Sequence, residues 1–216
     1  MAEKLGKVKK PLAKKFKKGR KLFFVPLIFK PFESDKEFLE LFNKYWEQAQ
    51  TQVKNLEEKL AKVKKVYHEL VTSTSEKGTK AIEQMNTGSY DITKHCLDKG
   101  ASIQQIEDGD MLLEFMDWSR CLSVGLQNQK VFSQVYQSFL KAQKRRNEHI
   151  AKRIDETLKS NEVGILLMRE GHQIQFVQDI QVFYVAPPSL DEIRRWFQKG
   201  ENVVRKEQQE KQQEED

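Results

Sequence analysis

Carboxylates and imidazoles follow three apolar stretches of the chain, and these are the residue types that act as general acids and bases. His68 and Glu69 come after "KVY", Glu107 after "SIQQI", and Glu170 and His172 after "GILLM". In an open α/β sheet, ligands bind outside the carboxyl ends of the strands, so parallel neighbouring strands would bring these side chains together. Glu69, Glu107 and His172 are therefore candidate catalytic residues, and His68 and Glu170 are candidate ligand-binding residues.

An arginine interrupts the apolar stripe of the helix predicted at residues 128–159. Arg146 has an apolar residue four positions away on each side, and Asn147 lies beside it. A guanidinium on a buried stripe needs a carboxylate or a ligand anion. Arg146 is thus predicted to hold an anion with Asn147 as a second ligand-binding residue, or to form a structural ion pair with Glu69 or Glu107.

Other polar residues have simpler interpretations. Arg120 is a ligand-binding candidate near an apolar flank, but it lies three residues after Asp117 and could pair along its own helix. His172 could equally be a turn residue with a satisfied ring. His95 and His149 are predicted on helices, where we identify no partner for either, and we expect both at the surface.

The motifs of familiar chemistries are absent from the sequence. His68, Glu69, Glu107 and His172 include ligand types for zinc, but they lack compact HExxH spacing, so no metal ligand is assigned and the cofactor is left open. No GxSxG, P-loop or GxGxxG occurs, which leaves a nucleophile elbow and the usual nucleotide cradles unsupported.

Apolar periodicity predicts strands that alternate with helices. Strands are expected in residues 21–29, 64–71, 101–108, 163–168 and 179–186, and helices in residues 36–60, 76–86, 89–99, 109–126, 128–159 and 188–198. This alternation indicates a helix-rich single α/β domain, with a partly parallel sheet of about five strands and long helices packed on it. A pure helical bundle is the alternative, and residues 163–168 and 180–186 argue against it.

Local signals refine the ends of these elements. Pro26 lies inside the first strand and is predicted at a sheet edge or a bulge, because it lacks a donor. Ser34 or Asp35 is the expected N-cap of helix 36–60. Ser189 is the expected N-cap of the last helix, with Glu192 as its capping-box partner.

Charge divides the chain into three parts. Residues 1–21 hold ten Lys or Arg against one acidic residue, and residues 201–216 hold three basic against six acidic residues, so the remainder carries no net charge (+6 − 9 + 3). We predict a basic disordered arm (1–21), an α/β domain (22–200) and a charged C-terminal tail (201–216). The arm is either a solvated segment or a contact for RNA, ribosome or anionic lipid through counterion release.

Cysteine usage and hydropathy bear on location. Cys96 and Cys121 have no CxxC spacing and are predicted as partly buried reduced thiols, which favours the cytoplasm. No stretch approaches the roughly 20 apolar residues of a membrane span. Helix 36–60 carries more aromatic residues than one face needs, so a homodimer through Phe38, Phe42 and Trp46 is a further prediction.

Two segments of the chain share a pattern with a known group. "RRNEHIAKRIDETL" followed by a strand ending in "EGH", together with the glutamate of "VYHEL", resembles TraB-like proteins, within the wider group of ChaN-like and erythromycin-esterase-like proteins. The resemblance covers about residues 63–72 and 144–173. It implies an α/β core in which Glu69, Arg146, Gly171 and His172 face one pocket. The first strand of the family ends in Gly-x-x-His, which "FFVPLIFKPF" lacks, so metal or esterase chemistry does not carry over directly.

These patterns lead to two hypotheses from different classes. The first is an α/β protein whose polar rim pocket binds or hydrolyses an anionic small molecule. The alternative is a non-enzymatic interaction protein whose basic N-terminal arm contacts RNA or the ribosome, with the rim cluster as a structural ion-pair network.

Overall fold

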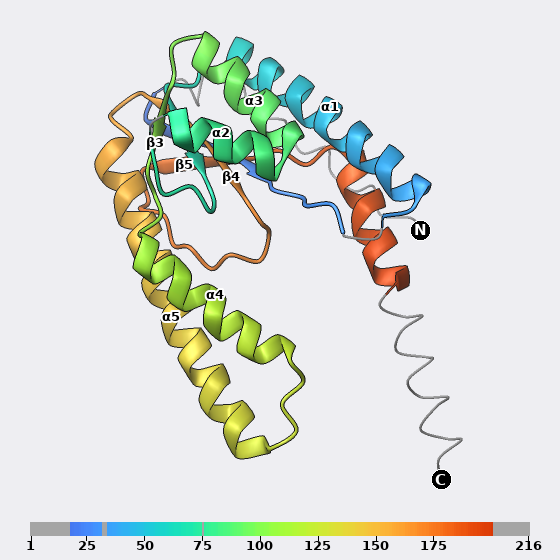
Figure 1. The fold of residues 1–216 in the computed structure, drawn as a ribbon. Helices are drawn as coiled ribbons and strands as arrows, with labels where there is room; N and C mark the ends of the chain where they lie inside the picture. The colour runs from blue at the N-terminus through green and yellow to red at the C-terminus, as the bar shows by residue number, and fades with distance from the viewer. Residues whose placement is uncertain (1–17, 32–33, 75, 201–216) are drawn as a thin grey trace, which may run out of the picture.

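A five-stranded parallel sheet lies between two layers of helices in the computed structural model, which describes residues 18–31, 34–74 and 76–200 (Figure 1). The strands are β1 (Arg20–Pro26), β2 (Lys65–His68), β3 (Ser102–Gln104), β4 (Val163–Met168) and β5 (Ile180–Tyr184). Their order across the sheet is β3-β2-β4-β1-β5, and every pairing is parallel. The prediction of a helix-rich α/β domain is confirmed.

The helices flank both faces of the sheet. They are α1 (Lys36–Lys59), α2 (Glu76–Met85), α3 (Thr87–Asp98), α4 (Gly109–Ser123) and α5 (Gln129–Thr157), and residues 188–200 are also helical. Within the described ranges, no helix is both long enough and apolar enough to cross a bilayer.

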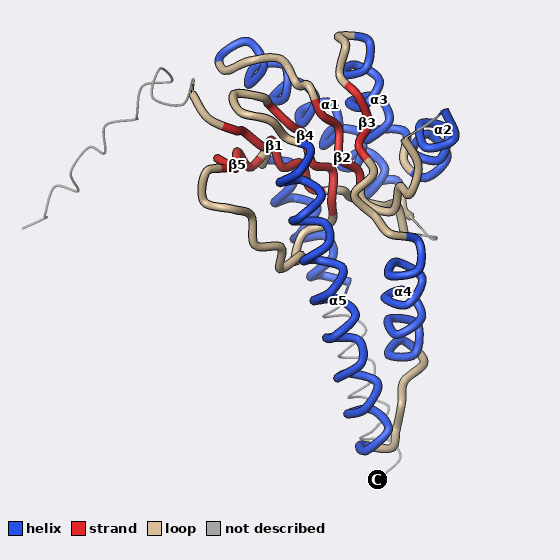
Figure 2. The backbone as a smooth tube through the Cα atoms, turned by 90° about the vertical axis from the view of Figure 1, so that its left-hand side faces the viewer, coloured by secondary structure: helices blue, strands red, loops and turns tan. Residues whose placement is uncertain are grey.

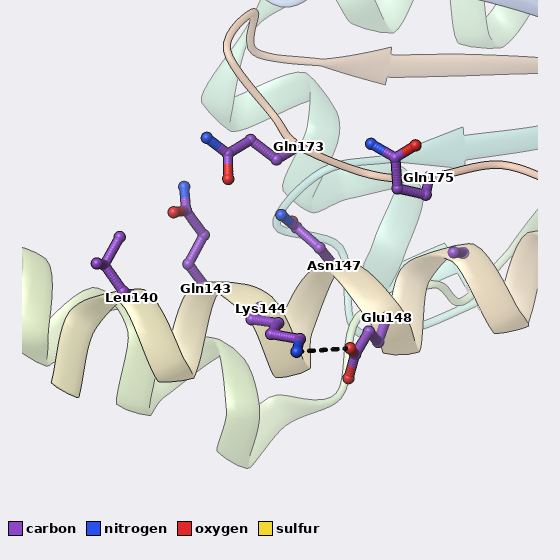
Figure 3. A pocket seen from close by; sticks show the side chains of 8 residues that line it. Leu140, Gln143, Lys144, Asn147, Glu148, Gln173 and Gln175 are labelled. Atoms are coloured by element: carbon purple, nitrogen blue, oxygen red, sulfur yellow. Dashed lines mark ion pairs between the residues drawn. The ribbon is translucent and has the colours of Figure 1, made fainter. Parts of the chain in front are cut away.

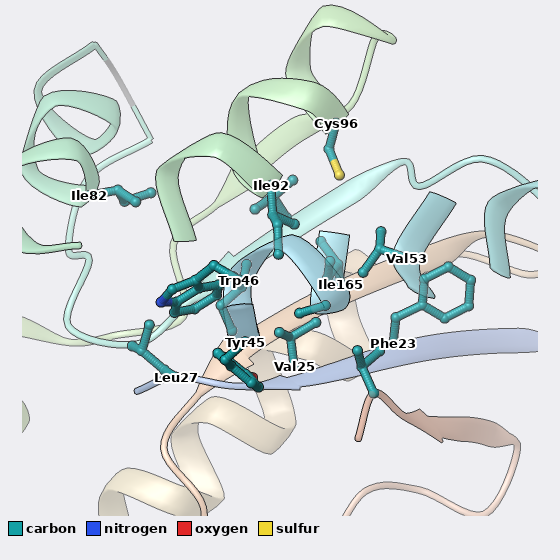
Figure 4. Packing of buried hydrophobic residues seen from close by; sticks show 14 of the residues in the cluster. Phe23, Val25, Leu27, Tyr45, Trp46, Val53, Ile82, Ile92, Cys96 and Ile165 are labelled. Atoms are coloured by element: carbon teal, nitrogen blue, oxygen red, sulfur yellow. The ribbon is translucent and has the colours of Figure 1, made fainter. Parts of the chain in front are cut away.

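Alternation along the strands creates two separate cores. Phe23 and Ile165 point toward the layer of α1 and α3, where Figure 4 shows them with Trp46 and Ile92. Phe24 and Leu166, the next residue in each strand, point to the other face and pack against Ile150 and its neighbours on α5. Successive side chains of a strand face opposite sides, and the continuous apolar sequence of β4 is explained by helices covering both.

The structure corrects two predictions about the first strand, the position of Pro26 in the sheet and the bounds of the strand. β1 lies between β4 and β5, so the edge or bulge predicted for Pro26 is wrong. Pro26 is the last residue of β1, and the pairing of β1 with β5 already ends at Phe24, so its missing N–H breaks no ladder bond. The strand spans Arg20–Pro26, so it starts one residue earlier and ends three residues earlier than the predicted 21–29, and Arg20 donates to Asp179 at 2.7 Å. Residues 1–17 of the predicted arm and residues 201–216 of the predicted tail lie outside the described residues.

Capping confirms one prediction and corrects another. Asp35 is the N-cap of α1, and its carboxylate accepts from the N–H of Phe38 at 2.7 Å. Ser189 does not cap the last helix, which begins at residue 188. Its buried hydroxyl instead donates to Gln48 Oε1 at 2.8 Å, and Glu192 pairs with Lys44 at 2.8 Å. Tertiary contacts with α1 thus use both side chains that would have formed the capping box.

The aromatic residues of α1 serve the core. Phe38, Phe42 and Trp46 are 0%, 2% and 6% exposed. They pack in edge-to-face and tilted pairs, among them Phe38 with Trp196 at 4.6 Å between ring centroids. The homodimer surface predicted on these three side chains is therefore wrong, because the domain itself buries them.

We predict that Gly88→Ala destabilises the fold by about 1–3 kcal/mol, through overpacking. A Cβ on Gly88, in the first turn of α3, would lie 2.1 Å from Cγ of the buried Trp46. Urea denaturation measures the effect. Gly109→Ala in the first turn of α4 is the control, since nothing lies within 4 Å of the added methyl. Equal midpoints for the two variants would contradict close packing of α3 on α1.

Candidate functional site

The carboxyl ends of β2, β3 and β4 meet at one edge of the sheet. β2 pairs with both β3 and β4, and His68 is opposite Leu167. Glu69, immediately after β2, donates its N–H to the Leu167 carbonyl at 2.9 Å. Parallel neighbours therefore bring Glu69 and Glu107 to a common edge, as predicted from the residues that follow each strand.

Arg146 of α5 reaches this edge and joins the two glutamates. It is 3% exposed, and its guanidinium lies over the Phe115 ring at 4.8 Å. Nε donates to Glu107 Oε2 at 3.0 Å, and Nη2 donates to Glu69 Oε1 at 3.1 Å and also to Glu107 Oε1. Both carboxylates already bind this guanidinium, so of the two interpretations of Arg146 the geometry favours the structural ion pair.

Arg169, the residue directly after β4, completes the charge balance. Its backbone N–H donates to Glu69 Oε2 at 2.9 Å, and its Nη2 donates to Glu69 Oε1 at 3.0 Å. Burial alone would raise the pKa of Glu69, but the bonds from Arg169 and the charges of Arg169 and Arg146 outweigh burial and hold that pKa below its ordinary value. A carboxylate stabilised in this way is a poor general base.

A strained residue connects the two glutamates. Leu70 has a φ of 68°, a left-handed conformation that is uncommon for a residue with a branched side chain. This turn directs the Leu70 N–H toward Glu107 Oε1, to which it donates at 3.2 Å. The ion-pair network thus fixes the backbone where β2 ends.

A pocket of about 160 Å³ opens beside the network. Its walls are formed by Glu69, Phe115, Gln143, Arg146, Asn147, Met168, Arg169, Glu170, Gly171 and His172. The side chain of Arg169 is 49% exposed, and its Nη1 makes no hydrogen bond to any residue in the described part of the chain. The pocket therefore presents a guanidinium edge that protein groups do not fully use.

His172 offers a second donor to this pocket. Gly171, with a φ of 80°, reverses the chain so that the His172 ring lies edge-on to Phe24, 4.8 Å between centroids. Nδ1 accepts from the Ile174 N–H at 3.4 Å, which places the proton of the neutral ring on Nε2. Partial burial lowers the pKa of His172, although the charge of Glu69 acts in the opposite direction. At neutral pH the ring is therefore an N–H donor without charge.

An adjoining pocket of about 450 Å³ is rich in amides. It shares Gln143 and Asn147 with the first pocket, and Gln173 and Gln175 reach it from the loop after β4 (Figure 3). Asn147 is 7% exposed, yet its amide has no hydrogen-bond partner among the described residues. The amide atoms of Asn147 are not among the fully enclosed polar atoms of the described residues that lack a partner, so this amide reaches the pocket space and is open to an outside group.

Two predicted ligand-binding residues lie elsewhere. His68 is 1% exposed and faces away from α5, with Nδ1 2.6 Å from the Glu69 carbonyl and Nε2 3.0 Å from Ser89 Oγ. Arg120 is exposed and pairs with Asp117 at 2.8 Å, which is the alternative that its spacing allowed. Neither residue contributes to the pockets.

Glu170 and His95 both have ion-pair partners that the sequence did not predict. Glu170 lines the smaller pocket, but Arg194 and the Tyr184 hydroxyl already bind its carboxylate. His95 is only 17% exposed in its side chain and pairs with the buried Glu57 at 2.9 Å, so the prediction of a surface position without a partner is wrong. His149 is partly exposed.

Sequence reasoning missed the residues with free polar groups. Arg169 directly follows β4, and that position alone could have identified it. Gln173 and Gln175 flank the buried Ile174, so an i, i+2 alternation in the loop was the available signal. Gln143, four residues before Asn147 on α5, shares its helix face.

Within the described residues, no three His, Cys, Asp or Glu side chains group together in a way that could hold a metal ion. Protein-family models, curated proteins and solved structures give no match to the chain. The fold and site define a class, namely a helix-rich α/β domain with a paired polar pocket at the carboxyl edge of a parallel sheet.

Proposed function

We propose that this protein binds a small anionic molecule in the joined pockets between α5 and the loop after β4. The observation that carries the proposal is that hydrogen-bond donors in the smaller pocket lack partners within the described chain, whereas its carboxylate acceptors already have them. The carboxylates of Glu69 and Glu170, which line the smaller pocket, are already bonded to arginines. Arg169 Nη1 and His172 Nε2 have no such partner among the described residues, so the pocket offers donors to a ligand rich in acceptors.

The proposal favours binding over hydrolysis. The general-base role first considered for Glu69 fits poorly, because several donors stabilise its charged form. Glu107 is likewise bonded to Arg146 and to the Leu70 N–H. Arg169 replaces Arg146 as the residue that would hold the anion, and Asn147 contributes a neutral amide where the two pockets join. The TraB-like resemblance supports a pocket at this edge of the sheet, since it implies that Arg146 and His172 face one pocket, but it assigns no role to Arg169.

Titration with inorganic phosphate and with citrate, followed by NMR, tests the proposal. We expect shifts of the Arg169 and His172 side-chain signals, and a loss of affinity of about tenfold or more in Arg169→Gln, because one charge-assisted hydrogen bond contributes about 1.5–3 kcal/mol.

Arg120→Gln is the matched control, since Arg120 is an exposed arginine paired with Asp117 and outside both pockets. Equal losses in the two variants would indicate nonspecific attraction to a basic surface. No shift at His172 with either anion would contradict the proposal.

The alternative is an interaction protein, and one observation favours it. The Arg146 network satisfies itself within the domain, as a purely structural cluster would. In that case residues 1–21 would supply the contact with RNA or the ribosome, and of these residues 1–17 lie outside the described part. Affinity for RNA that falls steeply with salt and disappears on deletion of residues 1–17, without any response of His172 to small anions, would favour the alternative.

A further inference from the structure

A helical arm extends from the domain without a core of its own. We use this name for residues 116–141, the distal halves of α4 and α5 and the loop between them, which Figure 2 shows running side by side away from the sheet. Phe115 and Ala142 are buried, but no residue between them is. Two helices alone bury too little surface to be stable, and within the described residues α4 and α5 mainly contact each other.

The arm carries more apolar surface than the contact between its two helices uses. Phe139 packs on Phe115 where the arm meets the domain, at 5.4 Å between ring centroids. Farther out, Val131 and Tyr136 are 43% and 42% exposed, and Val124 at the turn is 72% exposed. A hairpin helix needs a single apolar stripe facing its neighbour, and Val131 and Tyr136 leave exposed apolar surface on α5 in addition to such a stripe.

The composition of the arm identifies what covers this surface. Residues 116–141 contain four charged residues, Asp117, Arg120, Lys130 and Lys141, of which the first two pair with each other, whereas charged residues make up 32% of the chain. This low charge causes little repulsion between identical copies, and it offers only a weak field for selecting an oppositely charged partner. The remaining polar residues are Ser, Gln and Asn, which are compatible with an interface between like surfaces.

We propose that two copies of this chain associate through their helical arms, as an antiparallel pair of hairpins that forms a four-helix bundle around a twofold axis. Each arm is about 20 Å long and two helices wide, which gives on the order of 600 Å² of accessible surface per copy. Two such faces reach the lower end of the range for stable interfaces, roughly 1,200 Å² in total. The bundle supplies the shared core that one hairpin lacks.

Light scattering of the full chain between about 1 µM and about 100 µM tests the proposal, over the range expected for an interface of this size. We expect the mass to rise to twice that of the monomer, and the dissociation constant of the dimer to be at least about 100-fold higher in Val131→Glu or Val124→Glu than in a matched control. Val182→Glu is that control. Val182 is 45% exposed, as Val131 nearly is, but it lies on β5, and Figure 1 shows β5 far from the distal ends of α4 and α5. Circular dichroism verifies that each variant is folded.

The native thiols give a second measurement. Cys121 is exposed on the arm, contrary to the partly buried position predicted from the sequence, whereas Cys96 is buried. A spin label therefore attaches selectively at Cys121, and we expect a dipolar coupling between two labels that disappears in Val131→Glu. A monomer at every concentration would overturn the proposal, as would a dimer that Val182→Glu dissociates and Val131→Glu does not.

Discussion

Replacing Arg146 with methionine is expected to lower the free energy of unfolding by about 3–5 kcal/mol. Methionine keeps much of the side-chain volume over Phe115 but leaves Glu69 and Glu107, each 1% exposed, without the charge between them. Removing one partner of a buried network costs more than the network contributes, because the remaining charges stay desolvated. Urea denaturation at neutral pH measures the effect.

The neighbouring arginine provides the control. Arg145→Met removes a side chain that is 54% exposed and pairs with Glu114, and we expect it to cost about 1 kcal/mol or less. Glu69 keeps its bonds from Arg169, so Glu107 is the carboxylate that loses its guanidinium, and the double variant Arg146→Met with Glu107→Gln should recover part of the loss. If Arg146→Met costs no more than Arg145→Met, the network contributes nothing to the fold, and the structural interpretation of Arg146 is wrong.

Acidification from pH 6.5 to pH 4 is expected to remove about 3 kcal/mol of stability through His68. Burial lowers the pKa of His68 to about 4, although its bond to the Glu69 carbonyl and the Glu69 charge act in the opposite direction. Nδ1 of the neutral ring lies 2.6 Å from that carbonyl, and Nε2 lies 3.0 Å from Ser89 Oγ, so both ring nitrogens have a partner without a proton being added. The unfolded chain takes up a proton at a pH where the folded chain does not, so stability falls as the pH decreases through this window.

His68→Gln tests this window, because the slope of stability against pH between 6.5 and 4 should flatten, whatever the variant costs at pH 7. His172→Gln is the comparison. Partial burial also lowers the pKa of His172, and we expect that variant to remove a smaller part of the same slope. Glu69 and Glu57, with pKa values below their ordinary range, contribute stability that is lost only at lower pH. An unchanged slope in His68→Gln would mean that its ring titrates normally in the folded state.

The sequence by itself determined the elements and the edge at which polar groups collect. Period-3.6 spacing and a continuous apolar run placed α1 and β4 at almost their observed ends, because burial of one face or both leaves a direct imprint on residue type, whereas β2 is half as long as the predicted residues 64–71. Glu69 and Glu107 could be assigned to a common edge because each follows a strand. The alternation of side chains along a strand separates His68 from Glu69, since adjacent residues of a strand point to opposite faces, and it accounts for the contact of His68 with Ser89.

Only the tertiary structure decided which polar groups remain free for a ligand. Arg146 and its partners Glu107 and Glu69 lie 39 and 77 residues apart in sequence, so their mutual neutralisation depends on side-chain reach across three elements. The free donor proved to be Arg169, whose guanidinium has one edge on Glu69 and the other toward the pocket. Residue type determines which groups a side chain can bond to. The packing of strands and helices determines whether another group of the protein already makes that bond.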